Sequence, residues 1–298
     1  MATKETSTNR SDAAEATEFR KARKARRFTR RDVLAGGVAG ALLGLLGASG
    51  CGTSGGSQEE QETTEGDQRE ADAAEAGRLL ARPRTITEDE APSGLRVLNS
   101  GAERDGLVYV PPGYDAARPA PFALMLHGAY SGAREGIAPF LDLADEAGLI
   151  LLAPESRGQT WDIVLDGYGP DVEFIDRALE SVFSRYAVEP LRLAACGFSD
   201  GASYVLSLGP TNGDLFTHVI AFSPGFASPE ERRGSPNLFV SHGTPDEMLP
   251  ISGTSRRIVP RLRQEGYDVR YVEFDGPHEV PPEVAREALS WFMGTEAG

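Results

Sequence analysis

Short apolar runs alternate with longer stretches of helical periodicity from residue 95 to residue 292. The runs that fit strands cover residues 95–98, 107–110, 122–126, 149–153, 191–196, 218–222, 238–241 and 269–274. Helical spacing of apolar residues is clearest over residues 138–147, 172–186, 202–208, 253–265 and 282–292. This alternation is typical of an α/β fold, in which helices flank a mostly parallel sheet. No helix separates the first two strands, so we expect them to pair antiparallel at one edge.

The segment between residues 51 and 91 lacks this periodicity. Its first half is rich in Gly, Ser, Thr and Gln, and residues 59–75 contain eight Asp or Glu but only one basic residue, Arg69. Such a segment buries too little apolar surface to offset the entropy lost on ordering. We therefore expect residues 51–91 to be a disordered acidic tether and residues 92–296 to form a single α/β domain.

Residues 1–50 form a basic head that leads into an uncharged stretch. Arg30 and Arg31 precede residues 33–57, which carry no charge, and this arrangement resembles a Tat export signal, which the Tat translocase would read. A membrane-spanning helix is the alternative. The apolar part contains five glycines and is shorter than the roughly 20 residues that cross a bilayer, which favours the export signal over residues 1–50.

Cys51 follows the sequence Ala-Ser-Gly, which resembles the lipobox of bacterial lipoproteins. In that interpretation Cys51 is lipidated and becomes the first residue of the mature chain, whereas ordinary signal cleavage is the alternative. We expect an exported protein that is tethered to the outer face of the cytoplasmic membrane by its lipid anchor, or is otherwise secreted.

The overall charge narrows the range of partners. The 298 residues include 45 Asp or Glu and 30 Lys or Arg, which gives a formal net charge of −15. Nucleic-acid binding relies on clustered Lys and Arg, so this balance argues against a nucleic-acid partner. The two cysteines cannot form a disulfide framework, and the sequence leaves the oligomeric state open.

A nucleophile motif follows the fifth expected strand. Residues 197–201 read Gly-Phe-Ser-Asp-Gly and match G-x-S-x-G, in which the glycines permit a sharp strand-to-helix turn that exposes the serine. Residues 52–56 match the same pattern, but no strand precedes Ser54. The context therefore predicts Ser199 as the nucleophile of a hydrolase.

A serine hydroxyl needs a general base, and the base needs a carboxylate that orients it. His127, His218 and His242 stand at the ends of expected strands, where structural roles are favoured. His278 lies in a Gly-Pro loop between the last strand and the last helix, after Ser199 in the chain order that hydrolases with this motif keep. We predict His278 as the base.

The same chain order places the acid between the nucleophile and the base. Asp246 fits, because it follows the strand over residues 238–241 and precedes Pro250, which can begin a helix. Asp275 is the alternative, but it lies three residues from His278 in the same turn, where bonding to the loop backbone is favoured. We therefore predict Asp246.

The negative oxygen of a tetrahedral intermediate needs two hydrogen-bond donors. The backbone amide of Asp200, directly after the serine, is one candidate. The third expected strand runs into His127 and Gly128, which points to the amide of Ala129 as the other. Tyr130, Trp161 and Phe198 are candidates for the walls of a substrate pocket, with burial in the core as the alternative for each.

Seven segments together resemble the phospholipase/carboxylesterase branch of the α/β-hydrolase superfamily. They are residues 108–114, 127–128, 153–155, 161–162, 197–201, 241–246 and 276–278. The resemblance spans about residues 95–292, and it implies a Ser-His-Asp triad that works through an acyl-enzyme without a cofactor or metal. By resemblance these roles fall on Ser199, His278 and Asp246. Residues 247–249, Glu-Met-Leu, depart from relatives that have a small residue and valine after the acid.

The segment between the strands ending at residue 222 and beginning at residue 238 is too short for the helical lid of many lipases. We therefore expect an open site without a large lid, acting on small or polymer-borne carboxylic esters such as acylated sugars, feruloyl or acetyl esters. A serine peptidase of the same fold and a non-catalytic surface binding protein on a hydrolase scaffold are the alternatives. A dienelactone-hydrolase-like enzyme is disfavoured, because it is expected to have cysteine where Ser199 stands.

Overall fold

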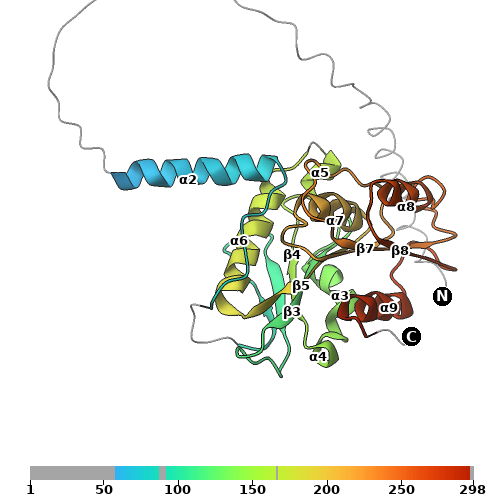
Figure 1. Cartoon of the computed structure of the whole chain (residues 1–298), viewed down its shortest axis with the longest axis horizontal. Coiled ribbons are helices and arrows are strands. Elements are labelled where there is room, and N and C mark those ends of the chain that lie inside the picture. Colours follow the sequence, from blue (N-terminus) through green and yellow to red (C-terminus); the bar gives the residue numbers. More distant parts are fainter. Residues whose placement is uncertain (1–57, 87–91, 166, 296–298) are drawn as a thin grey trace, which may run out of the picture. The chain divides into compact units, whose positions relative to one another are not determined.

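The computed structural model describes residues 58–86, 92–165 and 167–295. Eight strands form one sheet in the order β1-β2-β4-β3-β5-β6-β7-β8 (Figure 1). The strands are β1 (Gly94–Val97), β2 (Gly106–Val110), β3 (Ala120–Leu126), β4 (Ile150–Pro154), β5 (Val188–Phe198), β6 (His218–Phe222), β7 (Asn237–Gly243) and β8 (Val269–Phe274). Strand β2 is antiparallel to both neighbours, and the remaining pairs are parallel. The predicted mostly parallel sheet with an antiparallel edge is confirmed.

Helices cover both faces of this sheet (Figure 1). The described helices are α2 (Gln58–Glu75), α3 (Ala133–Leu141), α4 (Ala144–Ala147), α5 (Asp162–Leu165), α6 (Pro170–Arg185), α7 (Asp200–Thr211), α8 (Ser255–Gln264) and α9 (Pro282–Met293). Side chains alternate along each strand, so Phe122 and Leu124 of β3 join a core with α6, α7 and α8, whereas Ala123 and Met125 join a second core with α3, α4 and α9. Successive side chains of the apolar strands are thus buried on opposite faces of the sheet, one set in each core.

The parallel direction of β3 to β8 determines where the predicted site residues meet. Parallel strands end at one common edge of the sheet, so the loops after β3, β5, β7 and β8 lie along that edge. The segment over residues 223–236, between β6 and β7, contains no helix. The expectation that no large lid covers this edge at that position is confirmed.

Within the predicted domain over residues 92–296, two helical segments differ from the sequence prediction. The helix expected over residues 138–147 is two helices, α3 and α4, and α3 begins earlier, at Ala133. Its start is fixed by Glu135, whose carboxylate accepts a hydrogen bond from the Gly132 backbone N–H at 3.0 Å. The single-turn helix α5 was not expected, because four residues are too few to give a helical period.

The prediction of a disordered tether is wrong for residues 58–86. Residues 58–75 form helix α2, whose Glu, Gln and Ala residues favour helix formation. The composition alone does not show that a few apolar side chains in this helix and after it are buried against the rest of the domain. Ala74, Leu79 and Ala81 are buried, with Leu79 completely inaccessible to solvent. The folded domain therefore includes residues before the predicted boundary at residue 92.

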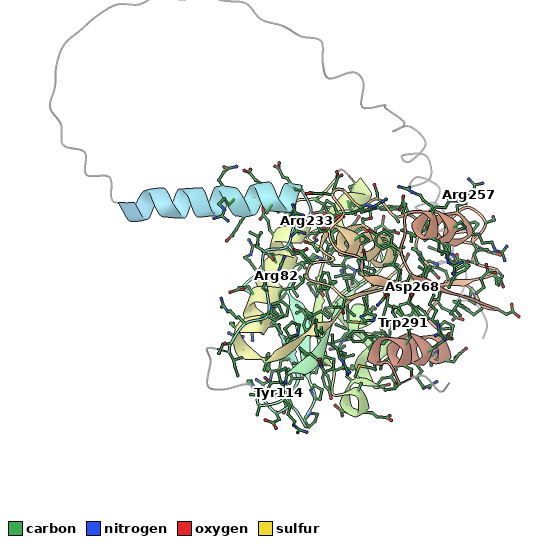
Figure 2. All side chains as sticks on the ribbon, viewed as in Figure 1. Arg82, Tyr114, Arg233, Arg257, Asp268 and Trp291 are labelled. Atoms are coloured by element: carbon green, nitrogen blue, oxygen red, sulfur yellow. The ribbon has the colours of Figure 1, made fainter. Side chains whose placement is uncertain are left out.

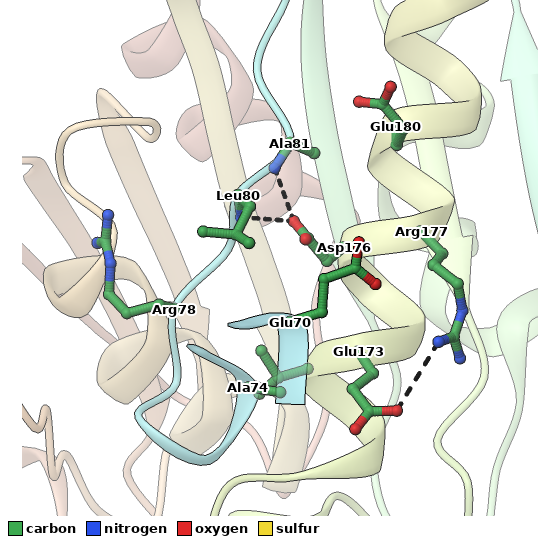
Figure 3. Close-up of a pocket in the computed structure, with 10 residues that line it drawn as sticks. Glu70, Ala74, Arg78, Leu80, Ala81, Glu173, Asp176, Arg177 and Glu180 are labelled. Carbon is green, nitrogen blue, oxygen red and sulfur yellow. Dashed lines mark hydrogen bonds and ion pairs between the residues drawn. The ribbon is translucent and has the colours of Figure 1, made fainter. Parts of the chain in front are cut away.

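We call residues 76–86 the strap, because polar bonds fasten this segment to α6 and to the end of α7. The Asp176 carboxylate of α6 accepts hydrogen bonds from the backbone N–H groups of Leu80 and Ala81, both at 2.8 Å (Figure 3). Beyond α7, Asp214 pairs with Arg78 at 2.9 Å and with Arg82 at 2.7 Å. A cavity of about 250 Å³ lies between α2, the strap and α6, and none of the residues lining it belongs to the predicted triad.

The predicted export signal and Cys51 lie outside the described residues, as does the first part of the predicted tether. Across the described ranges, we found no helix with the length and apolar character needed to span a bilayer. Export and lipidation therefore stay predictions from the sequence.

Candidate active site

Ser199 occupies a strained turn between β5 and α7. Its backbone has φ 56° and ψ −116°, a conformation that is costly for a residue with a Cβ atom. A methyl group on Gly197 would overlap the carbonyl group of Gly201, and one on Gly201 would overlap the carbonyl oxygens at the end of β3. The two glycines of the motif are thus required for the close approach of strand, turn and helix. The turn is held by the Ser199 N–H, which donates to the Phe222 carbonyl at 2.9 Å.

Ser199, His278 and Asp246 form a continuous hydrogen-bonded chain. The distance from His278 Nε2 to Ser199 Oγ is 2.9 Å, and the distance from His278 Nδ1 to Asp246 Oδ2 is 2.6 Å. An ionised carboxylate only accepts hydrogen bonds, so Nδ1 carries the proton and Nε2 can accept the Ser199 O–H. This is the tautomer a general base needs.

The chain is shielded at one end and accessible at the other. The Asp246 side chain is fully buried, the His278 side chain is 11% exposed, and Ser199 is only partly covered. The ring of Phe198 packs on the His278 ring, with 4.7 Å between centroids, which restricts its rotation. A carbonyl compound can therefore reach the hydroxyl while the carboxylate stays out of water.

The loop after β3 lies directly beside the serine. A Cβ atom on Gly128 would stand 3.4 Å from the Ser199 Cβ, so the backbone of this loop approaches the nucleophile closely. In the described part of the chain, neither the Ala129 amide nor the Asp200 amide has a protein acceptor. The Asp200 amide is also at the positive N-terminal end of helix α7. Both amides thus fit the predicted role as donors to a developing negative oxygen.

His127 holds the loop after β3 in place. The ring is buried, and its Nδ1–H donates to the Gly128 carbonyl at 2.7 Å, while Nε2 accepts the Ser156 N–H at 2.9 Å. Burial lowers the pKa of His127, in agreement with this neutral tautomer. His218, the first residue of β6, packs against Trp291 of α9, which Figure 2 labels. Both histidines have the structural roles expected from the sequence.

The three residues predicted to line a pocket differ in their exposure to solvent. Trp161 is fully buried, and its indole N–H donates to the His127 carbonyl at 2.8 Å, so the prediction that it lines a substrate pocket is wrong. Its large apolar ring is better stabilised beneath the loop than in solvent. Tyr130 is 66% exposed, directly after the Ala129 amide, and Phe198 lies half-buried against His278. Tyr130 and Phe198 remain candidates for substrate contacts.

Two carboxylates, the buried one of Asp171 and the partly buried one of Asp162, support the loop that contains Trp161. The backbone N–H of Asp162 donates to Asp171 Oδ2 at 2.6 Å, and the Asp171 N–H donates back to Asp162 Oδ2 at 2.9 Å. The Tyr204 hydroxyl donates to Asp162 Oδ1 at 3.1 Å. Burial, together with the charge of Asp171, raises the pKa of Asp162 to about 6. These residues fix the start of α5 and α6 beneath the site.

Sequence reasoning missed two side chains that touch the site residues. His242 Nε2 lies 3.2 Å from Asp246 Oδ2, and the Thr160 hydroxyl donates to the Asp200 carboxylate at 2.7 Å. The four-residue spacing between His242 and Asp246 was a visible signal, because a turn after a strand brings such residues together. No pattern in the sequence pointed to Thr160. Within the described residues, no group of three or more His, Cys, Asp or Glu side chains is arranged to hold a metal ion.

No protein-family model matches the chain. Among curated proteins, it is 29% identical over 171 residues to a protein named "Probable feruloyl esterase C" from Aspergillus niger, covering 54% of this chain and 60% of the relative. It is 28% identical over 197 residues to a protein named as an esterase, NocK, from Nocardia uniformis, covering 61% and 57%. The chain thus spans about three fifths of the length of the curated relatives it matches.

Solved structures show the same architecture. The esterase PE8 superposes with a TM-score of 0.53 at 22% identity, covering 64% of this chain and 98% of PE8. A ferulic acid esterase from Anaeromyces mucronatus superposes with a TM-score of 0.51 at 19% identity, covering 70% and 96%. The eight-stranded order with its antiparallel β2 and the agreement with these structures establish that this chain has the α/β-hydrolase fold.

Proposed function

We propose that this protein hydrolyses carboxylic esters with Ser199 as nucleophile, His278 as general base and Asp246 as the orienting acid. The observation that carries the proposal is the unbroken hydrogen-bonded chain of these three side chains, which converge from loops after β5, β7 and β8. The named esterases among its relatives, each matched over part of its length, favour esters over other acyl substrates.

In the proposed reaction, each step uses a group that lies within reach of the Ser199 hydroxyl. The Ser199 O–H transfers its proton to His278 Nε2 as Oγ attacks the ester carbonyl carbon. The carbonyl oxygen becomes negative and accepts hydrogen bonds from the amides of Ala129 and Asp200. When the intermediate collapses, the proton on Nε2 goes to the departing alkoxide, which leaves as the alcohol. Water then attacks the acyl-enzyme by the same route, and the free acid and Ser199 are released.

The accessible site favours small esters and esters displayed on a polymer. No helical lid stands between β6 and β7, and Tyr130 presents its ring to solvent beside the Ala129 amide. Two relatives are named as esterases of feruloyl or ferulic acid compounds, so hydroxycinnamoyl esters are the first class to test. Tyr130 is suited to stack on such an aromatic acyl group.

Hydrolysis of a matched ester series tests the proposal. Acetyl, butyryl, decanoyl and feruloyl esters would be compared for kcat/KM with the wild-type chain and with Ser199→Ala and Asp246→Asn. We expect Ser199→Ala to lower kcat by at least about 10⁴-fold, and Asp246→Asn by about 10³- to 10⁴-fold. Cleavage of peptides in preference to every ester would favour a serine peptidase, and no turnover by the folded wild type would favour a binding protein.

We further propose that the protein acts outside the cytoplasm, on the strength of the twin arginines and Cys51 in the sequence. Metabolic labelling with a fatty-acid analogue in a bacterial host tests this separately. Labelling of the wild type but not of Cys51→Ala is expected, and equal labelling of both would exclude Cys51 as the lipidated residue.

A further inference from the structure

A second histidine touches the predicted catalytic acid and has no part in the mechanism above. His242, near the end of β7, is completely buried, and its Nε2 lies 2.8 Å from the Leu249 carbonyl and 3.2 Å from Asp246 Oδ2. Its Nδ1 lies 2.7 Å from the Ser255 hydroxyl at the start of α8. All the polar atoms of the ring are therefore occupied.

These contacts determine which ring nitrogen of His242 carries the proton. A backbone carbonyl only accepts hydrogen bonds, so Nε2 must carry the proton and donate to Leu249, and the same nitrogen lies 3.2 Å from Asp246 Oδ2. The Ser255 hydroxyl then donates to the unprotonated Nδ1. Burial lowers the pKa of His242, which keeps the ring neutral. The ring consequently offers Asp246 a hydrogen-bond donor without a full positive charge.

Each oxygen of Asp246 is held by a separate set of donors. Oδ1 accepts the Leu249 N–H at 2.8 Å, and Oδ2 accepts the His278 Nδ1–H at 2.6 Å. His242 Nε2 lies 3.2 Å from this second oxygen, the one that faces His278. Without the His242 ring, His278 would be the one remaining partner of Asp246 Oδ2 among the described residues.

We propose that His242 is a positioning residue, whose Nε2–H fixes Asp246 Oδ2 toward His278 and shares its negative charge. The proposal rests on the proposed triad function. It predicts two effects of losing the donor: the carboxylate rotates more freely, and the undivided charge on Oδ2 stabilises the protonated form of His278 more strongly. The first lowers kcat, and the second moves the acidic limb of the pH profile of kcat/KM to higher pH.

Other charged groups near His242 are few. Asp246 and His278 face it from the loops after β7 and β8, and Glu273 is its register partner on β8. Glu273 is paired with Arg256 of α8 at 2.6 Å, so most of its charge is compensated locally. The pH profile therefore reports mainly on the His242, Asp246 and His278 group.

Two isosteric variants separate positioning from packing. The amide nitrogen of glutamine can take the place of Nε2, whereas that of asparagine corresponds to Nδ1 and cannot reach Asp246. We expect His242→Asn to lower kcat by about 10- to 100-fold, with KM within about twofold of the wild type. Its acidic limb should shift upward by about 0.5 to 1 pH unit. His242→Gln should recover most of both changes, and Ser255→Ala should leave the limb in place.

Equal losses in the two His242 variants, or an unshifted acidic limb in His242→Asn, would overturn the proposal and leave His242 a packing residue. His242→Leu, which lacks any donor, replaces His242→Asn if that variant fails to fold. If the folded wild type hydrolyses no ester, the triad proposal fails by itself. The contact between His242 and Asp246 is then tested by NMR, from the chemical shift of the downfield His278 Nδ1 proton. A shift in His242→Asn that is absent in His242→Gln supports positioning, whereas identical spectra of the two variants and the wild type contradict it.

Discussion

The indole N–H of Trp161 donates a hydrogen bond of 2.8 Å to the carbonyl oxygen of His127, at the point where β3 ends and the loop beside Ser199 begins. The two rings also pack against each other, with 4.8 Å between centroids. Trp161 thus supports from below the loop whose Ala129 amide is proposed to bind the reaction's negative oxygen. The side chain acts on the site through this backbone and has no exposed surface for a substrate.

Replacing Trp161 should therefore affect kcat more than KM. Trp161→Phe removes the hydrogen bond to His127 and leaves a small cavity, so we expect a loss of about 1 to 3 kcal/mol in unfolding free energy. We also expect kcat to fall by about 10-fold, because the loop amide is less well fixed. Trp291→Phe is the control and should leave kcat unchanged, because Trp291 lies near the end of α9 and packs against His218 at the start of β6 (Figure 2). A rise in KM with constant kcat would contradict this role.

The strain at Ser199 should appear as a stability difference between two inactive variants. A residue with a Cβ atom is held at φ 56°, whereas glycine adopts such a conformation freely. We expect Ser199→Gly to be more stable than Ser199→Ala by about 1 kcal/mol in urea unfolding, despite the greater flexibility of glycine in the unfolded chain. If the alanine variant is the more stable of the two, the turn stores no strain.

The strap offers a matched pair of leucines. Leu79 is fully buried and Leu80 is 46% exposed, although they are adjacent in the chain. Leu79→Ala should lower the unfolding free energy by about 2 to 4 kcal/mol, because it leaves a cavity in the core. Leu80→Ala should change it by less than about 0.5 kcal/mol. Similar small effects of both substitutions would show that the strap is not part of the folded domain.

Asp162 should make stability depend on pH. Its pKa is about 6 in the folded chain, above its ordinary value of 3.8, so the folded state binds more protons between these values. The contribution of Asp162 to stability is therefore fully present below about pH 4, and it is lost as pH rises to 6. We expect the wild-type minus Asp162→Asn difference in unfolding free energy to fall across this range. A flat difference from pH 4 to pH 7 would contradict the raised pKa.

The sequence predicted the sheet well because most strands are short apolar runs that are separated by stretches of helical periodicity. It also named Ser199, His278 and Asp246, which the structure brings together through the common edge of the parallel strands. Their catalytic roles stay a prediction. The motif and the chain order were sufficient to predict these three residues, because each follows a parallel strand and parallel strands end at the same edge of the sheet.

Other features depend on contacts that a local pattern does not contain. Composition made residues 51–91 look like a tether, yet Leu79 is buried in the core and Arg78 pairs with Asp214 beyond α7, more than 130 positions away. The sequence does not decide whether Trp161 lines a pocket or lies in the core, because aromatic side chains are common in both places. Only the arrangement of its neighbours shows that its indole N–H faces a backbone carbonyl.

If His278 activates the Ser199 hydroxyl, as proposed, a reagent specific for activated serines should label Ser199. The purified chain would be treated with a fluorophosphonate, digested and analysed by mass spectrometry to locate the modified residue. We expect a single adduct on Ser199, which forms much more slowly in His278→Ala and is absent in Ser199→Ala. Folded wild-type protein that stays unlabelled, or that carries the adduct on another residue, would contradict it.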